Sequence, residues 1–158
     1  MGAWSHGPFD NDDAADWLSE LLEQDSMTMI VDAFCAVTRP ANSEADDGYI
    51  EIPEASIAVA AAQVLRLITD LIKNTANGET SDEPSPEIRD WCQQFQTLKP
   101  TRKWYVAALE ALHASAHRKN SELYEVWNGS TEYGEWRESI DGLRTYFKHE
   151  LKSLDSNY

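Results

Sequence analysis

The chain has 158 residues, of which 42% are hydrophobic and 26% are charged, proportions typical of one globular domain. Its net charge of −15 argues against nucleic acids and anionic membranes as partners, because both require clustered Lys and Arg. The charge is uneven, since residues 1–51 hold 12 acidic residues and one basic residue. Such a segment favours a basic partner, and solubility is the plainer explanation of the same charge.

The first part of the chain predicts an aromatic arm followed by a helix. Residues 1–10 contain Trp4 and Phe9 but are too short and too broken by Gly and Pro to form a helix. We therefore expect an ordered arm that docks on the core. Asn11 or Asp12 offers an N-cap, and apolar residues then recur at helical spacing as far as Leu21.

Two further helices and two loops are expected before the middle of the chain. One helix is predicted from about Ser26 to the residue before Arg39–Pro40, because proline disfavours helical backbone in its preceding neighbour. Residues 40–52 are polar and acidic, which predicts a loop. Pro53 then opens the clearest helix, with apolar residues at steps of three and four. An Asn-Gly pair ends this helix, and residues 77–86 are predicted as the second loop.

The second half of the chain predicts four more helices. They cover Glu87–Phe95, a segment starting near Thr101, a short segment after Ser121, and Thr131–Leu154. The last has its acidic residues early and its basic residues late, as the helix dipole prefers. No alternating apolar pattern of useful length is present. The predicted fold is therefore an all-α single domain over residues 1–158, a bundle of five to seven helices with an ordered aromatic N-terminal arm.

One constellation suggests metal chemistry. Glu110, His113 and His117 share a helical face, and two His side chains four residues apart can bind one zinc ion. The metalloprotease motif also needs a Glu directly after the first His, and Ala114 stands there instead. An exposed polar stripe is the simpler interpretation, so no metal ligand is assigned. Nucleophile, phosphate-loop and dinucleotide motifs are also missing from the sequence, and we expect neither a cofactor nor enzyme activity.

The sequence favours a cytoplasmic protein. No secretory signal opens the chain, and Arg66, Asp70 and Lys73 interrupt its longest apolar run, so no membrane span is expected. Cys35 and Cys92 lie within apolar helical patterns and are expected to be buried, reduced thiols of the core.

The opening of the chain carries a resemblance to a known family. Residues 1–17 read MGAWSHGPFDNDDAADW and resemble the start of bacterial domain-of-unknown-function family 4259, whose members typically begin M-G-A-W-G-x-G-x-F-[DE]-N-D-x-A-x-D-W. Ser5 departs from the usual Gly, and the resemblance continues at the helix start Ile52–Ala55. The family brings no established activity, so the resemblance implies no catalytic residue. It does imply that the N-terminal arm matters.

Three functional hypotheses follow. The first is a protein-binding protein, most specifically an immunity protein or antitoxin that neutralises a basic toxin such as a nuclease. The second is a helical ligand- or metal-binding protein that uses Glu110, His113 and His117, and the third is a structural subunit of a larger complex. For the first, the predicted contact residues are acidic or lie in the acidic loop: Asp16, Glu20, Glu23, Glu44, Asp46, Asp47, Tyr49 and Glu51.

Overall fold

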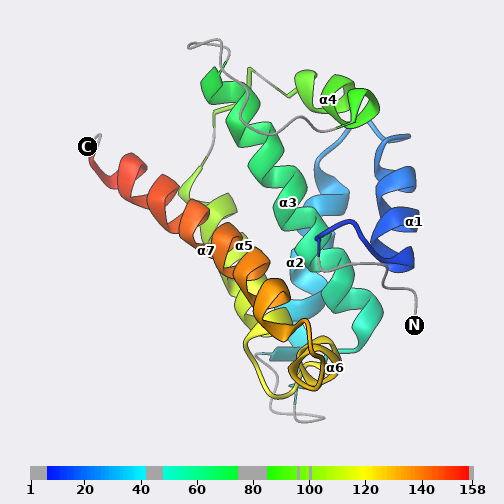
Figure 1. Cartoon of the computed structure of the whole chain (residues 1–158). Helices are drawn as coiled ribbons and strands as arrows, with labels where there is room; N and C mark the ends of the chain where they lie inside the picture. Colours follow the sequence, from blue (N-terminus) through cyan, green and yellow to red (C-terminus); the bar gives the residue numbers. More distant parts are fainter. Residues whose placement is uncertain (1–6, 42–47, 75–84, 96, 100, 157–158) are drawn as a thin grey trace.

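The structure is a computed structural model that describes residues 7–41, 48–74, 85–95, 97–99 and 101–156 (Figure 1). In these ranges the chain forms seven helices and no strand of more than an isolated bridge. The helices are α1 Asp12–Leu21, α2 Thr28–Ala41, α3 Ile52–Asn74, α4 Pro86–Gln93, α5 Arg102–Ala116, α6 Glu122–Asn128 and α7 Tyr133–Ser156. The prediction of an all-α single-domain bundle of five to seven helices is confirmed.

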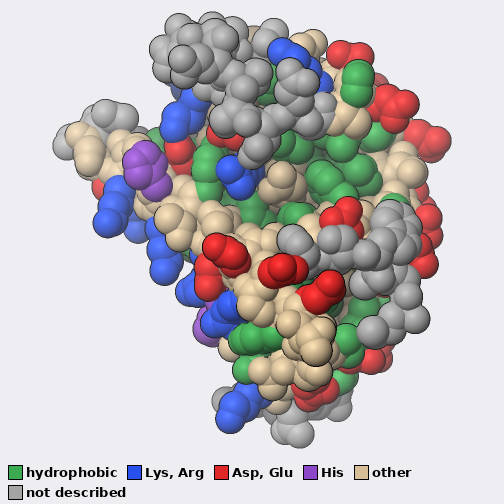
Figure 2. Space-filling view, in the orientation of Figure 1, with side chains coloured by type: hydrophobic (Ala, Val, Ile, Leu, Met, Phe, Trp, Pro, Cys, Tyr) green, Lys and Arg blue, Asp and Glu red, His purple; other side chains and the backbone are tan. Residues whose placement is uncertain are grey.

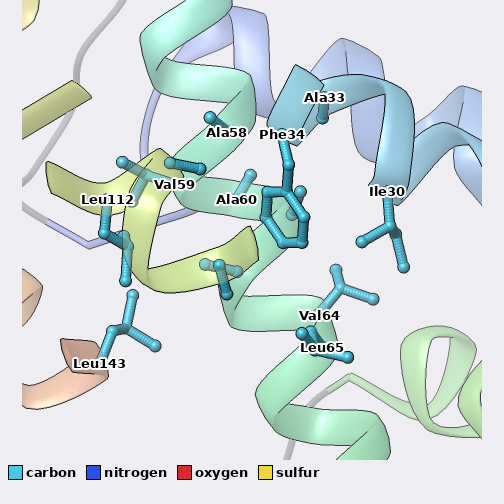
Figure 3. Close-up of a cluster of buried hydrophobic side chains, with 14 of the residues drawn as sticks. Ile30, Ala33, Phe34, Ala58, Val59, Ala60, Val64, Leu65, Leu112 and Leu143 are labelled. Carbon is cyan, nitrogen blue, oxygen red and sulfur yellow. The ribbon is translucent and has the colours of Figure 1, made fainter. Parts of the chain in front are cut away.

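Helix α3 lies at the centre of the bundle and contacts each of the other six helices. Its buried surface is made largely of small residues, and Ala58 and Ala61 are both fully buried. Figure 3 shows Phe34 of α2, Leu112 of α5 and Leu143 of α7 gathered around this helix. Small side chains let neighbouring helices approach closely, which explains how one helix can support so many partners.

Helix α3 is also long and apolar enough to cross a membrane, when judged by length and composition among the described helices. The stretch Ile52–Lys73 has a mean hydropathy of 1.6. By length and composition alone, its charged residues therefore do not rule out a membrane span, contrary to the expectation from the sequence. Of the apolar window, 67% is buried inside the bundle. A core helix passes the same test, and here the surrounding helices supply the apolar contacts.

The charged residues of α3 are accommodated by partners on α7. The Tyr146 hydroxyl donates to Asp70 Oδ1 at 2.7 Å, and Lys73 Nζ lies 2.6 Å from Oε1 of Glu150, which is buried. Arg66 lies over the Tyr146 ring, 5.1 Å from its centroid. Because each of these polar groups has a partner, the helix can be central without leaving unpaired buried charge.

An isolated parallel bridge joins the start of α3 to the start of α6. The Ile50 N–H donates to the Asn120 carbonyl at 2.8 Å, and the Glu122 N–H donates to the Ile50 carbonyl at 2.9 Å. Oε2 of Glu122 also accepts from the Ile52 N–H at 3.0 Å, which satisfies a free donor at the first turn of α3. Ser121 caps α6 with its own hydroxyl. This corner fixes where both helices begin.

Several predicted helix boundaries differ from the structure. Helix α2 continues to Ala41, although the sequence predicted an end before Arg39–Pro40. Proline holds φ near the helical value, so a helix can run on through proline in its last turn at the loss of one backbone hydrogen bond. Ile52 and Pro86 each begin a helix, although the sequence placed both in the predicted loops 40–52 and 77–86, and residues 42–47 and 75–84 lie outside the described ranges.

The N-terminal arm is described only in part. Trp4 and the rest of residues 1–6 lie outside the described ranges, so the prediction of an ordered arm stays a prediction there. Phe9 is partly buried and packs against the core. The Gly7 N–H donates to Asp10 Oδ2 at 3.1 Å, which closes a turn just before α1.

Candidate functional site

The local sequence determines which side of α1 faces solvent. Oδ1 of Asn11 accepts from the Ala14 N–H at 2.8 Å, the N-cap that the sequence predicted. Trp17 and Leu21 are buried in the core, so the opposite side of the helix must face water. The indole N–H of Trp91 donates to a backbone carbonyl just beyond the end of α1, which holds that end in place.

The exposed side of α1 and the turn after it carry the first group of predicted contact residues. Asp16, Glu20 and Glu23 are all exposed. Residues 10–32 contain eight acidic residues and no Lys or Arg. Figure 2 shows acidic side chains along the edge of the molecule where α1 lies, and Lys and Arg side chains along the side formed by α7. On the face shown, the edge formed by α1 is therefore acidic.

The second group of predicted contact residues lies elsewhere, at the corner between α3 and α6. Tyr49 is 46% exposed, and its hydroxyl donates to Oε2 of Glu125 at 3.4 Å, so this group already has a partner within the protein. Glu51 is exposed. The remaining members of the group are outside the described ranges and stay predictions: Glu44, Asp46 and Asp47.

A cleft of about 460 Å³ lies between α2, α5 and α7. Its polar lining comes from three parts of the chain: Thr38 of α2, Glu110 and His113 of α5, Arg118 just after α5, and Arg144 of α7. A second, more apolar groove of about 270 Å³ lies between α2 and α5 and shares Thr38 and Glu110 with the cleft. The two cavities therefore adjoin at Thr38 and Glu110, and the second has the more apolar lining.

His117 contacts Arg144, one of the residues that line this cleft. Its side chain is 5% exposed, and Nε2 lies 3.4 Å from Nη1 of Arg144 and 3.4 Å from Oδ1 of Asp141. Burial, together with the positive charges of Arg144 and Arg137, lowers the pKa of His117 to about 4. The ring is therefore neutral at pH 7. Because a guanidinium can only donate, Nε2 accepts from Arg144 and positions that side chain.

The structure places the three residues considered as metal ligands in different surroundings. Glu110 and His113 are exposed, and the His113 ring is parallel to the His117 ring with centroids 6.2 Å apart. In the ranges that the structure describes, no group of three His, Cys, Asp or Glu side chains is arranged to hold a metal ion. The expectation of an exposed polar stripe holds for Glu110 and His113 but is wrong for His117, because α7 covers that part of the surface.

The two cysteines occupy different environments. Cys92 is fully buried, and burial raises the pKa of its thiol to about 12. Cys35 is only partly buried and lines the apolar groove between α2 and α5. Neither forms a disulfide. The prediction of buried core thiols is thus confirmed for Cys92 and wrong for Cys35. Cys35 lies at the edge of the apolar face of α2 and lines a cavity.

Sequence reasoning missed the two arginines of the cleft. Arg118 directly follows His117 and could have been found by extending the polar face of α5 by one residue. Arg144 lies 27 residues further along the chain than His117, and nothing in the local pattern links the two. Their proximity results from the packing of α7 on α5.

Fold and surface together define an all-α protein with an acidic side and a cleft that combines polar and apolar walls. A family model described as "Domain of unknown function (DUF4259)" matches residues 2–139. This is most of the chain, so the protein belongs to that family, and the family that the sequence suggested is confirmed. No curated protein and no solved structure matches the chain.

Proposed function

We propose that this protein is a cytoplasmic protein-binding protein that neutralises a basic partner, most specifically as an immunity protein or antitoxin against a basic toxin such as a nuclease. The observation that carries the proposal is the exposed acidic side of α1, at the edge of the molecule where acidic side chains gather (Figure 2). A nuclease must present a cationic surface to its polyanionic substrate. An acidic, rigid helix face can occupy such a surface and exclude the nucleic acid.

The charge of α1 also favours rapid capture. Asp16, Glu20 and Glu23 are exposed, with no basic residue between residues 10 and 32 to cancel their field. A surface of one sign raises the rate of encounter with an oppositely charged protein, and this gain falls as salt screens it. Fast association is what a protein needs when it must inactivate a toxin before the toxin acts.

The test is capture of the partner from the native host at low and at high salt, using two variants of equal charge. Asp16→Lys/Glu20→Lys reverses two acids on α1, and Glu132→Lys/Glu138→Lys reverses two exposed acids near or within α7. We expect the wild type and the α7 variant to retain a basic protein at low salt. The α1 variant is expected to lose it, with association slowed about tenfold or more at low ionic strength.

Two results would count against the proposal. Equal capture by both variants would show that α1 is not the interface, even though net charge has changed equally. A captured protein that is acidic, or whose association is insensitive to salt, would remove the electrostatic basis altogether. If the captured protein is a nuclease, addition of the purified wild-type chain should inhibit it and the α1 variant should not.

A further inference from the structure

We propose that the cleft between α2, α5 and α7 binds a small amphiphilic carboxylate. The carboxylate lies between Arg118 and Arg144, and the apolar chain lies in the groove between α2 and α5. This site is separate from the α1 surface to which partner binding is assigned above, and it does not depend on that assignment.

The polar end of the cleft supplies two guanidinium groups from different parts of the chain. Arg144 is held by the contact of its Nη1 with His117, and its Nε is buried without a hydrogen-bond partner among the described residues, so the terminal amino groups are what it presents to the cleft. Arg118 donates from Nη1 to the Gly48 carbonyl at 3.4 Å, and a guanidinium has further donors that can reach a ligand. A planar guanidinium matches the two oxygens of a carboxylate, and two such groups on one cavity favour an anion.

The charges around the polar end favour a ligand with a single negative charge. Arg118 and Arg144 contribute two positive charges to the lining, and Glu110 contributes one negative charge. Asp141 is half exposed and lies 3.6 Å from Arg137 and 3.8 Å from Arg144, and Asp141 and Arg137 counted together add no net charge. One positive charge remains uncompensated in the lining, which suits a monoanion better than a phosphate dianion.

The apolar end explains why the anion should carry a hydrocarbon chain. The groove is lined by Met27, just before α2, by Val31 and Phe34 of α2 and by Trp104 of α5, and Val31 is 47% exposed. Exposed apolar side chains in a concave site gain from covering by an apolar ligand. The cavities of about 460 and 270 Å³ fit a small molecule, for which pockets of roughly 300–1,000 Å³ are usual.

The first experiment compares three probes by isothermal titration calorimetry on the full chain. Octanoate has both the anion and the chain, acetate has only the anion, and octanol has only the chain. We expect octanoate to bind at one site, at least about tenfold more tightly than either of the other two. Octanol binding as tightly as octanoate would overturn the anion site. Acetate binding as tightly would overturn the apolar site, and no saturable octanoate binding would overturn both.

Cys35 provides a test of where the ligand lies. It is partly exposed in the apolar groove, whereas Cys92 is fully buried with a raised pKa and serves as an internal reference. Saturating octanoate is expected to slow alkylation of Cys35 by iodoacetamide, as measured by peptide mass spectrometry, while Cys92 stays unmodified throughout. Unchanged alkylation of Cys35 in the presence of bound octanoate would overturn the placement of the chain.

Substitutions test the arginines. Arg118→Gln and Arg144→Gln are each expected to weaken octanoate binding about tenfold and to leave octanol binding unchanged. Arg89→Gln on α4, which loses the same charge outside the cleft, should bind octanoate as the wild type does. Glu110→Gln removes the carboxylate next to the ligand and should tighten octanoate binding about threefold. Wild-type affinity in both cleft arginine variants, or loss of binding in Glu110→Gln, would overturn the assignment.

Discussion

Gly48 is a residue whose backbone conformation matters to the corner between α3 and α6. Its φ is 65°, in the left-handed region that residues with a Cβ adopt only at a cost. The residue lies two positions before Ile50, which forms the bridge, and its carbonyl accepts from Arg118. The start of α3 and one wall of the cleft are therefore connected through a single glycine.

Gly48→Ala is expected to lower the free energy of unfolding by about 1–2 kcal/mol, because the left-handed conformation is strained by a side chain. Urea unfolding followed by Trp fluorescence measures the change. Gly142→Ala is the matched control, since a Cβ there meets nothing within 4 Å and the residue lies inside α7. That control should be more stable than the wild type by roughly 0.5–1 kcal/mol. Equal effects at the two positions would contradict the role given to Gly48.

His117 makes stability depend on pH. Its folded-state pKa is lowered from 6.5 to about 4, first by burial and then by Arg144 and Arg137, with Asp141 opposing the shift. Between these values the unfolded chain binds the proton and the folded protein does not, so stability is lost as pH falls from about 6.5 to about 4. The loss attributable to this residue is on the order of 3 kcal/mol at most.

The measurement is urea unfolding at several pH values between 7 and about 4.5 for the wild type and His117→Gln, whose amide can still accept from Arg144. The wild type should lose more stability over this interval than the variant. Only in the wild type does unfolding expose a buried neutral ring, which then binds a proton. Parallel curves for the two proteins would show that His117 does not carry this dependence. His113, the histidine nearest in sequence, is present in both and serves as the reference.

At the scale of the element, α3 is the support on which every other helix packs. Its fully buried alanines are what allow six neighbours to reach one axis. The same helix carries Asp70 and Lys73, whose partners Tyr146 and Glu150 belong to α7. The packing around the centre of α3 therefore depends on small side chains. The packing around its C-terminal half depends on charged side chains that have partners.

Ala61→Leu tests the volume requirement. Ala61 is fully buried, so three extra carbon atoms must displace neighbouring helices, and we expect a cost of about 1–3 kcal/mol or more in the free energy of unfolding. Ala36→Leu on α2 is the control, because Ala36 is exposed and the same substitution there should stay within about 0.5 kcal/mol. Denaturant unfolding measures both. An equal, small effect at Ala61 would mean that the bundle is loosely packed around α3.

At the scale of the whole molecule, the net charge of −15 opposes folding through self-repulsion. The repulsion is concentrated where α1 and its flanking residues hold eight acids without a base. The mixed charges of α7 contribute less, because acidic and basic side chains there lie near one another, as Arg144 and Asp141 do.

Salt should therefore stabilise this protein. Raising NaCl from about 10 mM to about 150 mM shortens the screening length from roughly 30 to 8 Å, and we expect the melting temperature to rise by a few degrees. The Asp16→Lys/Glu20→Lys variant should gain less from salt than Glu132→Lys/Glu138→Lys does, because it removes charge from the acidic side. A melting temperature that falls with salt would show that attractive surface pairs outweigh the repulsion.

Much of the fold follows from the sequence because helix signals are local. The apolar spacing that predicted α3 and α7, and the caps at Asn11 and Ser121, each depend on residues within about four positions of one another. The end of α2 was misplaced because the effect of Pro40 depends on how much helix follows it. The opening residues were also sufficient to indicate the family.

The candidate cleft could not be predicted in the same way. His117 and Arg144 meet because α7 packs on α5, and Cys35 opens onto a groove because α2 and α5 leave space between them. A local pattern specifies that a residue faces inward or outward on its own helix, but it does not specify which helix lies opposite. The sequence by itself determined the helices, the charge and the family, while tertiary packing decided which polar side chains share a cavity, because those contacts join residues far apart in the chain.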